Sequence, residues 1–237
     1  MTSLTESVTA EPSPTVIPLK GLRGSIARNM TLGWQAPRVA QAIHVDMSSA
    51  IVAQEKLQPQ AGEAVRVTLT VLVMSAVARA LKDHPELNAC LKEEGIVRMP
   101  SVNLGLAVAL PGGGLAVPVI QNADQLSPIT LAQVSRELAA GSKAGKLTPR
   151  AYQGGSFTVT NLGMTGIDWF TPILNPPQVG IIGMSRMADQ AIVREGRIVV
   201  APMLTLTLVF DHRAVDGYPA AMFLADVKRR LESSEAL

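Results

Sequence analysis

Apolar positions along the chain alternate between short β-branched runs and longer segments with helical spacing. Every fourth residue from Leu22 to Met30 is apolar, which predicts a helix over Gly21–Gly33. The longer run Val67–Leu81 ends in good helix formers, and we predict a buried helix there with Thr68 as its N-cap.

Other segments follow the same two patterns. Ser127–Ala144 predicts an amphipathic helix that begins at Ser-Pro, and Tyr218–Leu231 predicts a closing helix. Single strands are predicted over Val39–Asp46, Ser156–Thr160, Gln178–Met184 and Met203–Phe210. Hairpins are predicted over Cys90–Met99, over Asn103–Leu110 with Leu115–Ile120, and over Ala191–Val193 with Arg197–Val200. Strands that alternate with helices, without an internal repeat, indicate one α/β domain.

The first residues have a different composition. Residues 1–15 are polar, rich in Ser and Thr, and interrupted by Pro12 and Pro14, so they cannot build a packed core. We therefore divide the chain into a flexible tail or linker remnant over 1–15 and one domain over 16–237.

Composition excludes several classes of protein. Apolar residues make up 47% and charged residues 17% of the 237 positions, which excludes general disorder. The net charge of +2 comes without a basic cluster, so no nucleic-acid partner is expected. No apolar run reaches the roughly 20 residues of a membrane helix. The single Cys90 cannot form an internal disulfide, which indicates a reducing compartment, the cytoplasm by default.

One histidine stands out by its position. His212 follows a predicted strand, lies between acidic residues and an arginine, and precedes Gly217. An imidazole has a reference pKa of about 6.5 and can therefore take up and return a proton near neutral pH. From spacing alone, a structural role at the helix start is the more frequent interpretation. A zinc site at His212 and Asp216 would need a third ligand, and none is nearby, so no metal is expected.

The segment Asp211–Gly217 (DHRAVDG) resembles the histidine signature of dihydrolipoamide acyltransferases, the E2 core components of 2-oxoacid dehydrogenase complexes. Further segments resemble the family in the same order along the chain: Leu22–Met30, Leu81–Ala89, Asn103–Ile120, Gly154–Gly163 and Phe170–Gln178. The resemblance covers Ile17 to Leu231. It implies a chloramphenicol acetyltransferase-like fold, a two-layer α/β sandwich in which helices flank a mixed β-sheet.

The resemblance also implies a set of site residues. His212 matches the general base that removes the proton from the thiol of coenzyme A or dihydrolipoamide, and Thr160 matches the hydroxyl that donates to the oxyanion. Asp216 is expected to orient the catalytic loop through an ion pair with Arg23. The expected substrate-binding residues are Asn161, Trp169, Phe170 and Arg28.

In such a protein coenzyme A and lipoamide are substrates, and no cofactor is bound tightly. The resemblance implies a homotrimer in which His212 and Thr160 meet across chains, and it leaves a larger cubic or dodecahedral assembly open. A lipoyl-bearing domain is an expected partner, with the E1 and E3 components as indirect partners. No lipoyl or subunit-binding domain is recognised in the sequence, so the lipoyl group is expected from another domain or chain.

The expected reaction is the transfer of a short acyl group between dihydrolipoamide and coenzyme A, in the cytoplasm or, in a eukaryote, in the mitochondrial matrix. Two alternatives remain open. One is a coenzyme A-dependent acyltransferase that acts on a small hydroxyl or amine. The other is an assembly scaffold without turnover. The acyl group, whether acetyl, succinyl or branched, is not specified by the sequence.

Overall fold

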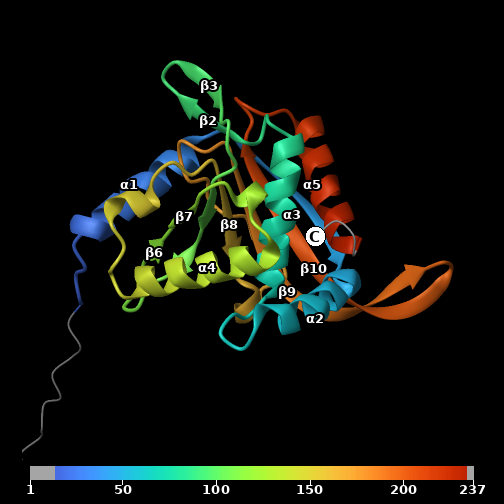
Figure 1. Ribbon diagram of the computed structural model, residues 1–237. Helices are drawn as coiled ribbons and strands as arrows, with labels where there is room; N and C mark the ends of the chain where they lie inside the picture. Colours follow the sequence, from blue (N-terminus) through green and yellow to red (C-terminus); the bar gives the residue numbers. More distant parts are fainter. Residues whose placement is uncertain (1–13, 234–237) are drawn as a thin grey trace, which may run out of the picture.

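A six-stranded mixed sheet forms the centre of the molecule (Figure 1). The computed structural model describes residues 14–233, apart from the side chain of Leu22. The strands, in their order across the sheet, are β1 (Arg38–Asp46), β10 (Arg197–Asp211), β9 (Gly180–Arg194), β8 (Phe157–Asn161), β4 (Leu104–Leu106) and β7 (Val119–Ile120). Strands β9, β8 and β4 run parallel, and the other neighbours are antiparallel.

Helices complete a two-layer α/β sandwich, as predicted. α3 (Leu69–Asp83) and α5 (Gly217–Glu232) lie side by side over one face of the sheet, with α2 (Ser48–Ala61) and α4 (Pro128–Lys143) next to α3 (Figure 1). α1 (Gly21–Gln35) lies away from these helices. The remaining short elements are β2 (Ala89–Lys92), β3 (Gly95–Arg98), β5 (Val108–Ala109), β6 (Leu115–Ala116), and the 3-10 turns η1 (Ala123–Gln125), η2 (Pro149–Tyr152) and η3 (Gly163–Thr165).

The predicted helices and the predicted hairpin at 90–99 are confirmed, but three stretches differ. The predicted strand Asn103–Leu110 is divided into β4 and β5. The strands predicted around 178–184 and 191–193 are parts of the single 15-residue β9, which with β10 extends beyond the sheet as a two-stranded ribbon. α2 was not predicted, because it contains Pro59 and only two of its residues, Ala50 and Ala53, are buried, so its apolar face is weak.

The tail predicted over 1–15 lies almost wholly outside the described residues. Residues 14–20, which the structure does describe, are exposed and have no regular secondary structure.

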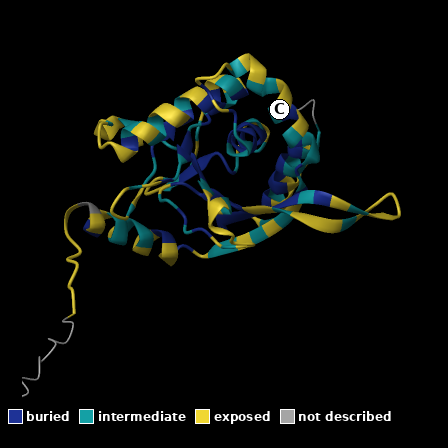
Figure 2. Ribbon diagram, turned by 90° about the horizontal axis from the view of Figure 1, so that it is seen from below, coloured by how far each residue is buried: buried dark blue, intermediate teal, exposed yellow. Residues whose placement is uncertain are grey.

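α3 is the central core helix. The Thr68 hydroxyl accepts a hydrogen bond from the Val71 amide at 3.3 Å, so the predicted N-cap is confirmed. Ten of the 15 residues of α3 are buried, and its neighbours are the sheet, α4 and α5 (Figure 2). Its nearly continuous apolar sequence reflects burial on most sides.

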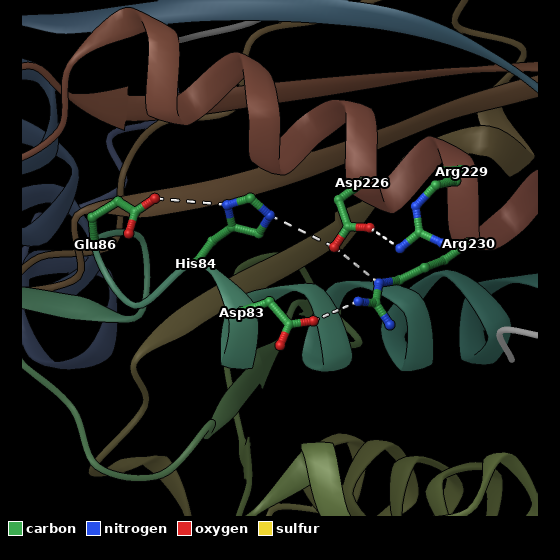
Figure 3. A network of polar contacts seen from close by, with 6 residues as sticks. All are labelled: Asp83, His84, Glu86, Asp226, Arg229 and Arg230. Carbon is green, nitrogen blue, oxygen red and sulfur yellow. Dashed lines mark hydrogen bonds and ion pairs between the residues drawn. The ribbon is translucent and has the colours of Figure 1, made fainter.

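A polar network joins the end of α3 to α5 (Figure 3). Arg230 donates to Asp83 at 2.6 Å and, through Nε, to Asp226 at 3.0 Å, and Arg229 also donates to Asp226. His84 Nε2 lies 3.6 Å from the same Asp226 carboxylate. Burial raises the pKa of Asp226, but the hydrogen bonds and charges of the two arginines outweigh it, so this pKa lies below its ordinary value.

We expect Asp226→Asn to lower the free energy of unfolding by about 2 kcal/mol at pH 7, because it removes the charge that the arginines share. The folded pKa lies below the ordinary value of 3.8, so the carboxylate stabilises the fold above that pH and loses this contribution as the pH falls through the folded pKa. Urea unfolding from pH 7 to pH 3 should therefore show the difference from wild type shrinking below about pH 4.

The matched control is Asp168→Asn, which breaks the exposed pair with Arg186 and should change the stability by no more than about 0.5 kcal/mol. Equal effects of the two substitutions would contradict a structural role for the α3–α5 network.

Candidate active site

The loop after β10 holds His212 just beyond the end of this strand. The His212 amide donates to the Pro37 carbonyl at 3.0 Å, which ties the loop to the start of β1. The nearly buried Asp211 carboxylate accepts bonds from the backbone amide of Arg213 at 3.0 Å and from its guanidinium at 2.6 Å. The Val215 amide closes the turn by donating to the Asp211 carbonyl. The loop is therefore fixed by its own residues and by the bond to Pro37.

The His212 ring contacts Phe210 and Asp216, whereas its Nε2 atom is free in the described structure. Its centroid lies 5.7 Å from that of Phe210, and its Nδ1 lies 3.9 Å from an Asp216 carboxylate oxygen. Within the part of the chain that the structure describes, Nε2 has no partner, and the side chain is 44% exposed. This arrangement leaves Nε2 available to a reacting group.

The predicted ion pair between Arg23 and Asp216 is not formed within the chain. Across residues 14–233 no ion pair includes Arg23, and the partner of Asp216 is His212. Asp216 is the N-cap residue of α5, so the start of the helix fixes its backbone. Its carboxylate makes no capping hydrogen bond and remains exposed. The carboxylate lies beside the ring of His212 but does not hydrogen-bond to it in the described structure.

Thr160 lies on the opposite side of the sheet from α3, near the end of β8. Its side chain lines a cavity of about 260 Å³ whose apolar walls include Ile26 and Met30 of α1, Phe170, and Ile181 of β9. In the described structure its hydroxyl makes no hydrogen bond. The hydroxyl of Thr158, two residues earlier on the same face, donates a hydrogen bond to the Gln178 side-chain oxygen at 2.5 Å. Thr160 thus offers a free donor in a mostly apolar cavity.

Two contacts fix the outer wall of this cavity. The Asn29 amide donates to the Asn175 side-chain oxygen at 2.8 Å, so α1 is bound to the loop that precedes β9. Gly33 packs on the same loop, because a Cβ at this position would lie 2.2 Å from the Leu174 carbonyl oxygen. These two asparagines were not predicted as site residues, since a contact between such distant positions has no local pattern.

The predicted substrate-binding residues separate into three groups. Phe170 lines the cavity with Thr160. Asn161 faces the other side of β8, where it donates to the Thr70 hydroxyl at 2.9 Å and lines a second cavity of about 560 Å³. Trp169 and Arg28 are exposed and line neither cavity; Arg28 donates to the Ser25 hydroxyl at 3.1 Å.

The second cavity contains groups that were not predicted as site residues. Arg66 and Thr70 line it at the start of α3, together with Ser185, whose buried hydroxyl has no hydrogen-bond partner in the described structure. A cation, a helix N-terminus and the unpartnered Ser185 hydroxyl together suit an anionic ligand. Only the fold brings Ser185 of β9 next to Arg66 and Thr70, because β9 is far from the start of α3 in the sequence.

Within one chain, Thr160 and His212 are too far apart to act on the same atoms. Thr160 pairs with Gly183, Phe210 pairs with Gly180 three residues earlier on β9, and His212 lies two residues beyond Phe210. At about 3.3 Å per residue and about 4.8 Å between strands, their Cα atoms are roughly 20 Å apart.

Residues 14–233 contain no cluster of three or more His, Cys, Asp or Glu that could hold a metal ion. In the same residues, no helix has the length and hydropathy needed to cross a membrane.

Comparisons with known proteins agree with the fold. Chloramphenicol acetyltransferase shares the fold, with a TM-score of 0.54 at 15% identity over 91% of this chain and 98% of that chain. Residues 11–237 match the family described as 2-oxoacid dehydrogenases acyltransferase (catalytic domain). The chain therefore belongs to this family.

Two curated relatives are similar to most of this chain. It is 41% identical over 93% of its length to the dihydrolipoyllysine-residue acetyltransferase component of the acetoin cleaving system of Bacillus subtilis. It covers 56% of that relative and 50% of the corresponding pyruvate dehydrogenase component, so it spans about half the length of the curated relatives it matches.

Among solved structures, the dihydrolipoamide acetyltransferase of Azotobacter vinelandii is 33% identical with a TM-score of 0.90, over 100% of this chain and 99% of that chain. The cubic core of a pyruvate dehydrogenase multienzyme complex is 32% identical, with the same TM-score and coverage.

We expect Gly33→Ala to lower the free energy of unfolding by about 1–3 kcal/mol, because the new methyl group meets the Leu174 carbonyl and must displace α1 from the loop. The comparison is Gly141→Ala in α4, where the methyl group meets only the flexible Leu147 side chain. There the gain in helix propensity, up to about 1 kcal/mol, should dominate. Urea unfolding measures both changes. A stabilising Gly33→Ala would show that α1 does not depend on this contact.

Proposed function

We propose that this chain transfers a short acyl group between dihydrolipoamide and coenzyme A, as the E2 core of a 2-oxoacid dehydrogenase complex. The observation that carries the proposal is the pair formed by an imidazole with a free Nε2 and a free hydroxyl in an apolar cavity. Family membership supports it, as do the acetyltransferase names of the relatives.

In the proposed reaction His212 Nε2 removes the proton from the attacking thiol. The thiolate sulfur adds to the thioester carbonyl carbon, and the carbonyl electron pair moves to oxygen. The Thr160 hydroxyl donates a hydrogen bond to this oxyanion. The intermediate then collapses, the other sulfur leaves with its electron pair, and the imidazolium returns the proton to it.

Residue spacing supports these roles. In the Azotobacter enzyme a serine, a histidine and an asparagine were investigated for their role in the catalytic mechanism, and the serine and histidine stand 52 positions apart. Thr160 and His212 stand the same 52 positions apart in this chain. The asparagine lies four positions after its histidine, as Asp216 does after His212. A carboxylate would therefore act here in the place of an amide.

We further propose that the site is assembled from two chains of a homotrimer. The separation of roughly 20 Å within one chain requires that His212 come from a neighbour if it is to meet Thr160. A larger cubic assembly is proposed by analogy with the cubic core among the relatives. A lipoyl-bearing domain would supply the lipoyl arm, and the E1 and E3 components would take part through that domain.

The two cavities suit the two substrates. The dihydrolipoamide arm and the acyl group fit the apolar cavity at Thr160. The phosphates of coenzyme A fit the second cavity, where Arg66 and the start of α3 provide positive potential. Because Cys90 is buried and unpaired, a reducing compartment is proposed, the cytoplasm or the mitochondrial matrix.

Acceptor preference separates this proposal from its alternatives. Incubation of the purified chain with acetyl-CoA and free dihydrolipoamide should yield acetyl-dihydrolipoamide. Transfer only to a small amine or hydroxyl would favour the alternative acyltransferase. Equal rates for wild type and His212→Ala would favour a scaffold without turnover.

Thr160→Ala should lower kcat by about 100- to 1000-fold, the usual loss when one oxyanion donor is removed. Thr160→Ser keeps the hydroxyl and should retain most of the turnover. Steady-state rates with acetyl-CoA and dihydrolipoamide provide the measurement. Equal losses in the two variants would show that the hydroxyl is not the group that matters.

Mixed particles test the shared site. His212→Ala and Thr160→Ala chains, each inactive alone, are co-expressed with different tags and purified through both tags. If each site takes its histidine and its threonine from different chains, every mixed trimer contains one complete site out of three, so the doubly purified trimers should have about a third of the wild-type activity, and a large random assembly about a quarter. Mixed particles as inactive as either parent would place both residues of a site on one chain.

A further inference from the structure

Three small residues form a row across the sheet on the face that carries the reactive hydroxyl. Thr160 of β8 pairs with Gly183 of β9, which pairs in turn with Thr207 of β10. Paired residues in neighbouring strands point to the same side of a sheet. Between the two threonines there is therefore a gap, about 10 Å long, that no side chain of the sheet fills.

The ring of Phe170 occupies this gap. A Cβ on Gly183 would lie 2.8 Å from Phe170 Cζ and 3.2 and 3.3 Å from the two adjacent ring carbons, so the tip of the ring rests on the glycine. Phe170 also lines the cavity that contains Thr160. Its ring is thus the end wall of that cavity on the side of β10.

The far end of the row contains an unsatisfied polar group. Thr207 is completely buried, and its hydroxyl has no hydrogen-bond partner in the described structure. The space that Phe170 fills thus lies between the free hydroxyl of Thr160 and the unpartnered hydroxyl of Thr207. Without the ring, the cavity would extend over Gly183 toward β10.

We propose that Phe170 is the residue that sets the length of the transferred acyl group. The inference rests on the proposed acyl transfer at Thr160. With the carbonyl oxygen at the Thr160 hydroxyl, an acetyl group fits in front of the ring, and a longer or branched chain collides with it. The strip over Gly183 up to Thr207 is a latent subsite for longer acyl groups.

The test compares kcat/KM for acetyl-CoA, butanoyl-CoA and isobutanoyl-CoA, with dihydrolipoamide as acceptor. In Phe170→Ala the ratio of butanoyl to acetyl should rise by about 10- to 100-fold, in the range by which apolar pockets discriminate methylene groups. Phe170→Leu should give an intermediate ratio and covers the case in which the alanine variant does not fold. Tyr152→Ala removes an aromatic ring elsewhere and should leave the ratio unchanged.

A second substitution tests the contact itself. Gly183→Ala should lower the acetyl rate in the wild-type background, because the methyl group displaces the ring. In the Phe170→Ala background the same change should cost little, because the colliding atoms are gone. Equal costs in both backgrounds would contradict the contact.

The two proposals can fail separately. If wild type transfers acetyl to dihydrolipoamide and folded Phe170 variants keep its acyl ratio, only the role of Phe170 is wrong. If wild type transfers none of the three acyl groups, the proposed function itself is wrong, and the inference fails with it.

Discussion

The register of three neighbouring strands constrains everything that this chain can do chemically. β9 pairs with β8 on one side and with β10 on the other, and these pairings fix Thr160 near the end of one strand and His212 past the end of another. A one-residue slip in either pairing would turn the side chains to the opposite face. The separation of the imidazole and the hydroxyl therefore follows from backbone hydrogen bonds, and it makes a second chain part of the proposed site.

The two faces of the sheet pack against different elements. On one face α3 and α5 supply the core, and the network around Asp226 joins the two helices at some distance from the proposed chemistry. On the other face small residues leave room, and α1 and the loop before β9 enclose it. Stability thus comes mainly from one layer, while the layer that encloses the cavity depends on a few specific contacts such as that of Gly33.

Glycine makes this second layer possible in two places. Gly33 lets α1 approach the Leu174 carbonyl, and Gly183 lets the ring of Phe170 rest on the sheet. Neither glycine has a left-handed backbone, so close packing and not turn geometry explains both. The size of the proposed acyl cavity is therefore determined by which residues lack a side chain as much as by those that line it.

The sequence by itself determined the α/β class, the principal helices, the N-cap at Thr68 and the histidine loop, because each depends on local periodicity or on contiguous residues. The tertiary structure decided what those residues meet. It brought Phe170 to Thr160, turned Asn161 to the opposite face, left Arg23 apart from Asp216 within the chain, and joined Asn29 to Asn175. These relations depend on strand register and on contacts between distant segments, for which a single sequence carries no periodic signal.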